Sequence, residues 1–254
     1  MIRTSMLLAA LLAAGSAQAA LQTGDIAFTS FNADEDGLSF VALADIAANT
    51  TIYFTDNEWT GAAFNSGESY NQWNSGASAV SAGTVVRLLA YDKTTLSASA
   101  GTLSRTSVAG NTNWGISNSG ETLYAYLGGS ATTPATFLAA ITNGTFVADG
   151  SLTGTGLTEG TSNAIRLTAK AGASSEPDFA QYTGTRTFSS VAAAKAALGD
   201  LNNWTIDTVN NSASAALVPN TTAFQIAVVP EPESYTLMLA GLGMLGAIAR
   251  RRLG

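Results

Sequence analysis

The chain has 254 residues, a formal net charge of −7 at pH 7, and neither histidine nor cysteine. The lack of these two residue types excludes disulfide bonds, imidazole and thiolate metal ligands, and catalytic arrangements of the Ser-His-Asp or Cys-His kind. The acidic balance disfavours nucleic acid and anionic lipid as partners, and it favours solubility, cations or neutral glycans.

The N-terminal segment has the pattern of a secretory signal peptide. Arg3 gives it a positive start, residues 6–14 are apolar, and Ala17 and Ala19 provide a small-x-small cleavage site. The sequence therefore predicts a signal peptide over residues 1–19 and a mature chain that begins at Ala20. Export through the inner membrane is the expected consequence.

Residues 20–228 are predicted to form one body with a single hydrophobic core. Thr, Ser, Asn, Gly and aromatic residues are frequent there, and short period-two runs alternate with turn residues, which indicates β-structure. The predicted strands cover residues 26–31, 38–43, 51–55, 84–89, 121–126, 137–141, 164–167, 204–206 and 224–228. Gly128 and Gly129 are predicted to turn the chain between the strands over 121–126 and 137–141.

One helix is predicted over residues 190–198, with Ser190 at its start and Gly199 just past its end. The polar stretches 97–113 and 143–163 are predicted to be loops. Many short strands joined by long polar connections are typical of a sandwich. The fold class expected is therefore all-β, an antiparallel immunoglobulin-like β-sandwich with one short helix, followed by a C-terminal hydrophobic helix.

Part of the body resembles a known family. Residues 24–28 (Gly-Asp-Ile-Ala-Phe), 40–43, 49–59, 81–86 and 116–123 follow one another in an order similar to bacterial lamin-tail-like modules. The resemblance covers residues 24–142 and implies an immunoglobulin-like sandwich that acts as an accessory or binding module. Residues 143–228 exceed that small domain, and we expect them to add strands to the same sandwich.

The turn after the first predicted strand is a candidate calcium site. Oxygen-bearing side chains alternate there before Gly37, as at the start of a calcium loop. A complete EF-hand is excluded, because the position of its bidentate glutamate holds Leu43. The alternative is a solvated hairpin turn, since acidic residues and glycine favour turns on their own account. The proposed ligands are Asn32, Asp34 and Asp36.

A second candidate follows the strand over 51–55. Asp56 and Glu58 lie beside Trp59, and a glycosidase needs only two carboxylates and a surface for the sugar. This pair would make the protein an extracellular glycan hydrolase. The alternative is that the acidic residues close the strand through local hydrogen bonds. We expect most of the tryptophans to be packing residues that close the sandwich.

The C-terminal segment combines a short motif, an apolar run and a basic end. The run without charges over residues 236–249 would form a helix of about 21 Å, short for a bilayer core of about 30 Å. The basic residues after it favour a cytoplasmic C-terminus. The motif is Val229, Pro230, Glu231 and Pro232, and the basic end is Arg250, Arg251 and Arg252.

This order of features resembles the PEP-CTERM sorting tail of exported bacterial proteins. The resemblance implies that residues 229–254 are a sorting tail with a transmembrane segment, recognised and processed by an exosortase, and held only transiently in the inner membrane. We therefore expect a cell-surface or extracellular-matrix protein with a non-enzymatic structural or binding role, and extracellular polysaccharide as a partner. No cofactor is expected apart from calcium, and a glycan hydrolase is the alternative.

Overall fold

The computed structural model describes residues 19–170, 176–207, 217–227, 240–242 and 244–245. The predicted signal peptide, except Ala19, and most of the predicted sorting tail lie outside the described residues. Among the helices that are described, none has the length and apolar character needed to cross a membrane.

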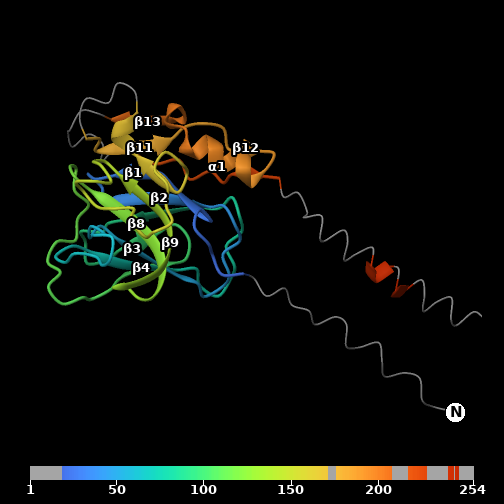
Figure 1. The fold of residues 1–254 in the computed structure, drawn as a ribbon, viewed down its shortest axis with the longest axis horizontal. Helices are drawn as coiled ribbons and strands as arrows, with labels where there is room; N and C mark the ends of the chain where they lie inside the picture. The colour runs from blue at the N-terminus through green and yellow to red at the C-terminus, as the bar shows by residue number, and fades with distance from the viewer. Residues whose placement is uncertain (1–18, 171–175, 208–216, 228–239, 243, 246–254) are drawn as a thin grey trace, which may run out of the picture.

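In the described part of the chain, the body is an antiparallel β-sandwich of two six-stranded sheets, which confirms the predicted all-β fold class (Figure 1). Most of the predicted C-terminal helix lies outside the described residues. The first sheet has the order β13 (Trp204–Asp207), β11 (Phe179–Tyr182), β1 (Ile26–Asn32), β2 (Gly37–Ala42), β5 (Val85–Leu89), β6 (Ser97–Ala98). The second has the order β10 (Ala164–Arg166), β9 (Thr133–Thr142), β8 (Thr122–Ser130), β3 (Thr51–Thr55), β4 (Tyr70–Asn74), β7 (Thr102–Arg105). Within these sheets, the pair β9–β10 is parallel. Residues beyond 142 thus contribute β10 to one sheet and β11 and β13 to the other.

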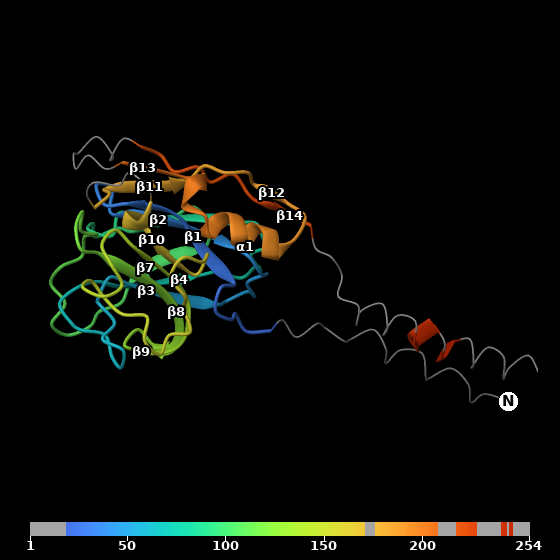
Figure 2. The same cartoon turned by 45° about the horizontal axis from the view of Figure 1, so that its top comes forward.

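A helical segment and a small parallel pair of strands flank the first sheet (Figure 2). The helix α1 (Val191–Gly199) begins where the Ser190 hydroxyl accepts a hydrogen bond from the Ala193 N–H at 3.1 Å, as the sequence predicted. Short 3-10 turns occupy Leu167–Ala169 and Leu201–Asn203. The pair consists of β12 (Thr187–Phe188) and β14 (Gln225–Ile226), and α1 contacts β12.

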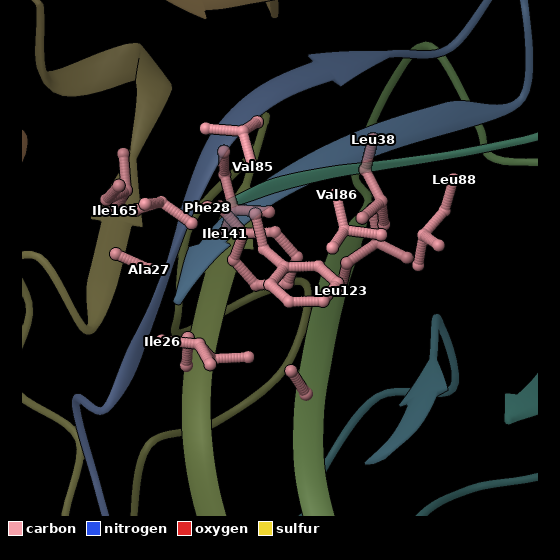
Figure 3. Packing of buried hydrophobic residues seen from close by; sticks show 14 of the residues in the cluster. Ile26, Ala27, Phe28, Leu38, Val85, Val86, Leu88, Leu123, Ile141 and Ile165 are labelled. Atoms are coloured by element: carbon pink, nitrogen blue, oxygen red, sulfur yellow. The ribbon is translucent and has the colours of Figure 1, made fainter. Parts of the chain in front are cut away.

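The apolar core lies between the two sheets. Phe54 of the second sheet meets Phe28 and Phe40 of the first, with ring centroids 6.4 and 5.6 Å apart, and Trp73 packs edge-on against Phe40. Figure 3 shows further members of this core, contributed by β1, β2, β5, β8, β9 and β10. Alternate residues of a strand face opposite sides. Consecutive members of the cluster, such as Val85 and Val86, therefore show that it continues onto the other face of the first sheet.

The outer face of the second sheet is covered as well. Tyr124, Tyr126 and Phe137 point outwards from β8 and β9, and Trp59 and Phe64 lie against them. The irregular stretch over residues 143–163 completes the cover with other apolar side chains. This predicted loop is therefore a packed layer of the body.

Three local predictions need correction. Gly128 and Gly129 lie inside β8, and the chain turns only after Ser130. The strand requires a glycine at position 128, because the Thr133 carbonyl approaches so closely that a Cβ would clash with it. The stretch over 97–113 is not all loop, since it contains β6 and β7. The predictions also lacked β4, β11 and β12, of which β4 is the most polar.

Residues 217–227 run along the sandwich from one end to the other. The Asn32 side chain, at the end of β1, donates to the carbonyl of Leu217, whereas the Phe224 N–H donates to Gly83, near the end of β2. The segment finishes with the Ala227 N–H bonded to the Phe188 carbonyl. Both the first described residues and Ala227 therefore lie at the end where β1 begins, which we call the attachment end (Figures 1 and 2).

Candidate functional site

Most of the acidic residues gather at the end of the sandwich opposite the attachment end, which we call the acidic end. Here β1 and β3 finish, and β2, β4 and β8 begin. The two sheets are tied together at this end, because the Asp36 carboxylate, beside β2 of the first sheet, accepts from the N–H of Ile116, which precedes β8 of the second, at 2.6 Å. The Asp36 carbonyl also accepts from the Tyr91 N–H at 3.0 Å, which extends the pairing of β2 with β5. More than half of the chain's 18 acidic residues lie there: Asp34, Glu35, Asp36, Asp56, Glu58, Glu68, Asp92, Glu121, Asp149, Glu176 and Asp178.

Strand pairing brings residues that are distant in the sequence into one cluster. The last residue of β3 pairs with the first of β4 on one side and with β8 on the other. Asp56 directly follows β3, Asn71 lies in β4, and Glu121 directly precedes β8. By strand alternation these three side chains share the face of Phe54 and Leu123, which belong to the core between the sheets. Carboxyl and amide groups therefore close the core at the acidic end.

The buried residues Asp56, Ser69, Asn71, Tyr91 and Glu121 form what we call the inner polar cluster. The Ser69 hydroxyl donates to Asp56 Oδ1 at 2.8 Å, and Asn71 Nδ2 donates to Ser69 at 3.3 Å. Glu121 Oε2 accepts from the Ser117 N–H at 2.9 Å. Glu58 and Glu68, from the loop between β3 and β4, lie at the rim of this cluster.

Several oxygens of the inner polar cluster have no hydrogen-bond partner among the described residues. They are Asp56 Oδ2, Asn71 Oδ1 and the hydroxyl of Tyr91, whose residues are 0% exposed, together with Oε2 of the rim residues Glu58 and Glu68. An unpartnered polar atom in a protein interior destabilises the fold by about 1–3 kcal/mol. A native interior with several such atoms in one place calls for a partner that supplies positive charge or hydrogen bonds.

The carboxyl groups of this cluster resist ionisation. Burial raises the pKa of Asp56 to about 8, and the neighbouring Glu68 adds to the effect while the Ser69 hydroxyl opposes it. Burial and the charge of Glu58 raise the pKa of Glu68 to about 7. Burial, followed by the charge of Asp56, raises the pKa of Glu121 to about 10. The carboxyl groups thus repel one another in a medium that solvates them poorly.

The basic side chains near the acidic end bind groups outside the inner polar cluster. Arg87 pairs with Glu35, and Lys93, which is largely exposed, pairs with Asp92. The guanidinium of Arg105 donates to the backbone carbonyls of Tyr91 and Lys93, and it lies 4.3 Å from the centre of the Trp114 ring. These contacts order the rim, and they leave the inner carboxyl groups facing one another.

The calcium ligands predicted in the first turn lie at the same end but are not part of the inner polar cluster. Asn32 is the last residue of β1 and is buried, and its Oδ1 accepts from the Glu35 N–H at 3.3 Å. Asp36 has a φ of 50° and turns its carboxylate to Ile116. Its pKa is raised to about 6, chiefly by burial and further by Asp92. Calcium binding by Asn32, Asp34 and Asp36 stays a prediction.

The predicted sugar site is divided between two sides of the second sheet. Asp56 faces the inner core and is 0% exposed. Trp59 packs on the outer face, 5.1 Å from Phe137, and its ring N–H donates to the Thr153 carbonyl at 2.9 Å. This packing, with that of Trp73 and Trp204, confirms the expectation that most tryptophans serve as packing residues. Catalysis by Asp56 and Glu58 stays a prediction.

The sequence pattern identified Asp56 but not its partners Ser69, Asn71, Tyr91 and Glu121. A signal was present, because Glu121 stands at the start of a predicted strand and Asp56 at the end of another. Strands that pair antiparallel place such positions side by side, but the sequence does not show which strands pair.

The comparisons with known proteins identify the tail. Residues 228–252 match the family model of the PEP-CTERM protein-sorting motif, as the sequence predicted. No curated protein and no solved structure matches the chain. The motif marks an exported protein that is sorted at the membrane by an exosortase. The resemblance of residues 24–142 to lamin-tail-like modules stays a prediction.

Proposed function

We propose that this protein is a cell-surface or extracellular-matrix module that is sorted through its C-terminal tail and then works as a non-enzymatic binding or structural unit. The observation that carries the proposal is the sorting motif at residues 228–252. An apparent leader at the N-terminus and a strongly acidic body with no cysteine fit an exported, soluble domain.

The path of the chain supports an orientation for this module. The last described residue before the tail, Ala227, lies at the attachment end, hydrogen-bonded to Phe188. The acidic end lies at the opposite end of the strands. A tail held in the membrane would therefore turn the acidic end towards the outside, where polysaccharide, cations and other surface proteins are found.

The composition and the burial of the carboxyl groups favour binding over catalysis. The chain has no histidine or cysteine to act as a base or nucleophile at neutral pH. The carboxyl groups with the most strongly raised pKa values, Asp56 and Glu121, are buried, so a substrate could reach them only after a rearrangement. A neutral or weakly charged glycan is the partner that fits the acidic surface best.

Mass spectrometry of the protein isolated from its own cells tests the sorting step. We expect a mature form that begins at Ala20 and lacks the apolar segment after the Val229–Pro232 motif. Glu231→Gln should retain the tail and accumulate in the membrane fraction, whereas the matched variant Glu233→Gln should be processed. An intact tail on a freely soluble wild-type protein would contradict the proposal.

A glycan array followed by a turnover assay separates the module from the hydrolase. The proposal predicts glycan binding without release of reducing sugar. Hydrolysis by the wild type that disappears in Glu58→Gln would establish the alternative enzyme. Binding that also survives in Glu58→Gln would place the glycan site elsewhere on the module.

A further inference from the structure

The inner polar cluster combines two features that rarely persist together in a protein interior. Its carboxyl groups, Asp56 and Glu121, lie on the inward face of the paired strands β3 and β8, where one strand ends and the other begins. In addition, the uncharged oxygens Asn71 Oδ1 and Tyr91 OH are fully buried and unpartnered beside them. A proton on one carboxyl group would relieve the repulsion, but it would supply one hydrogen-bond donor where several oxygens lack a partner.

We propose that the inner polar cluster is a calcium-binding site, in which one ion lies between the carboxylates of Asp56 and Glu121 and takes the amide oxygen of Asn71 as a neutral ligand. A cation at this point offsets the repulsion between the carboxylates and gives the unpartnered oxygens a ligand role at the same time. The site is distinct from the turn of Asn32, Asp34 and Asp36.

The available donors define the class of the metal. All of them are oxygens, since the chain has no histidine and no cysteine, and oxygen-only sites suit hard cations. Calcium accepts six to eight oxygens in an adaptable geometry, including carboxylates, amide carbonyls and water. Magnesium requires a nearly ideal octahedron and loses its water reluctantly, so a mixed and irregular set such as this one favours calcium.

A third carboxylate ligand for the ion is available at the rim of the cluster. Among the described residues, no group of three or more acidic side chains is already arranged to hold a metal ion. Asp56 and Glu121 are fixed in the interior by Ser69 and Ser117. Glu68, by contrast, comes from the loop between β3 and β4 and is less buried, with one unpartnered oxygen. We infer that calcium draws Glu68 inwards as a third carboxylate ligand.

Melting curves of the full chain in detergent, with a chelator and with calcium chloride added in steps to 10 mM, test this site. Binding to the folded state alone at ten times the dissociation constant should raise Tm by about 3 °C or more. Extracellular calcium modules commonly have dissociation constants of about 0.1–1 mM, within this range. Magnesium chloride at the same concentrations should give a smaller rise.

Two near-isosteric variants locate the ion. Asp56→Asn and Glu121→Gln keep an oxygen for the Ser69 and Ser117 hydrogen bonds, and they should fold while losing the calcium response. At pH 9 in chelator, Asp56→Asn should also melt at a higher temperature than the wild type, because the variant lacks the buried carboxylate. This gain distinguishes a lost ligand from a damaged fold. Asp45 is an exposed acidic residue at the attachment end, so the control variant Asp45→Asn should keep the full calcium response.

Two outcomes would overturn the proposal. Calcium that leaves the wild-type Tm unchanged up to 10 mM would exclude the site. A calcium response that survives in Asp56→Asn and Glu121→Gln, but is lost in Asp34→Asn/Asp36→Asn, would move the ion to the first turn. Neither outcome depends on which partner the module binds, so a failure here leaves the sorting and surface role untouched.

Discussion

The two ends of the sandwich close the same core with different chemistry. At the attachment end, Trp204 packs edge-on against Tyr182, and Phe224 stacks on Phe188. The polar atoms of these residues are matched, since the Trp204 ring N–H donates to the Leu198 carbonyl at 2.9 Å and the Tyr182 hydroxyl is also bonded to a carbonyl. At the acidic end the closing residues are Asp56, Asn71 and other polar side chains, and several of their oxygens are unmatched.

This difference indicates that the attachment end closes the core for stability, whereas the acidic end is a candidate binding site. An aromatic closure with satisfied hydrogen bonds contributes stability by itself. A cluster of buried, mutually repelling carboxyl groups lowers the stability of the isolated chain, and proteins keep such arrangements mainly where a ligand or a reaction uses them. The sandwich would then be stabilised from the attachment end, where the tail leaves, and would present its binding chemistry at the other.

The largest effect that we predict belongs to the attachment end. Trp204→Ala should lower the free energy of unfolding by about 3–5 kcal/mol, because it removes a buried indole and leaves the Leu198 carbonyl unpaired. Urea denaturation measures the change. The matched control is Trp114→Ala at the acidic end, where the half-buried ring mainly covers Arg105, and it should lose about 1 kcal/mol. Equal losses at the two ends would contradict the comparison.

A smaller effect should follow from loosening the segment that precedes the tail. Gly83 has a φ of 90°, and a Cβ there would overlap the carbonyl of Phe224. Gly83→Ala should therefore destabilise the protein by about 2 kcal/mol and speed hydrogen exchange in residues 217–227. The control is Gly160→Ala. Gly160 has a similar φ of 80°, but a Cβ added there would have no neighbour within 4 Å, so this variant measures the backbone strain without the clash. If hydrogen exchange in residues 217–227 is the same in both variants, the contact of Phe224 with Gly83 does not hold this segment in place.

The smallest predicted effect is a dependence of stability on pH at the acidic end. The pKa of Asp56 is about 8 in the folded protein and about 4 when unfolded, so its contribution is present at low pH and is lost as pH rises towards 8. Glu68, Glu121 and Tyr91 face Asp56 and do not offset its charge, whereas Ser69 offsets it in part. In chelator, Tm should therefore fall from pH 5 to pH 9.

Asp56→Asn should flatten this slope and raise the stability at pH 9 by about 1–2 kcal/mol. Thermal melts over the pH series measure the effect, and Asp45→Asn is the control at the attachment end. A wild-type profile that rises with pH would show that the inner carboxyl groups are better solvated than their burial indicates.

Local patterns predicted much of the fold. The strand Thr51–Thr55 has its expected bounds, and the helix begins after Ser190 as expected, because alternation and capping are local signals. The strand Tyr70–Asn74 was not predicted, because its inward position Asn71 is polar and interrupts the apolar alternation. The strand was hidden by the same residue that contributes to the candidate site.

The candidate site was predicted only in part, for a similar reason. Asp56 and its neighbour Glu58 were visible as an acidic pair at a strand end. Glu121 joins them only through the pairing of β3 with β8, and Tyr91 reaches them from the other sheet. Such contacts depend on strand order and register, which local sequence does not specify. The sorting motif, in contrast, is contiguous in the sequence and was therefore predicted correctly.

If the acidic end is a cation site rather than a closure of the core, an ion must bind between Asp56 and Glu121. Crystals of the protein soaked with terbium, an oxygen-seeking substitute for calcium, would locate the ion by its anomalous scattering. We expect one strong peak within coordination distance of Asp56 and Glu121, with the Asn71 oxygen turned towards it. A strong peak only at Asp34 and Asp36, or no peak at the acidic end, would contradict this expectation.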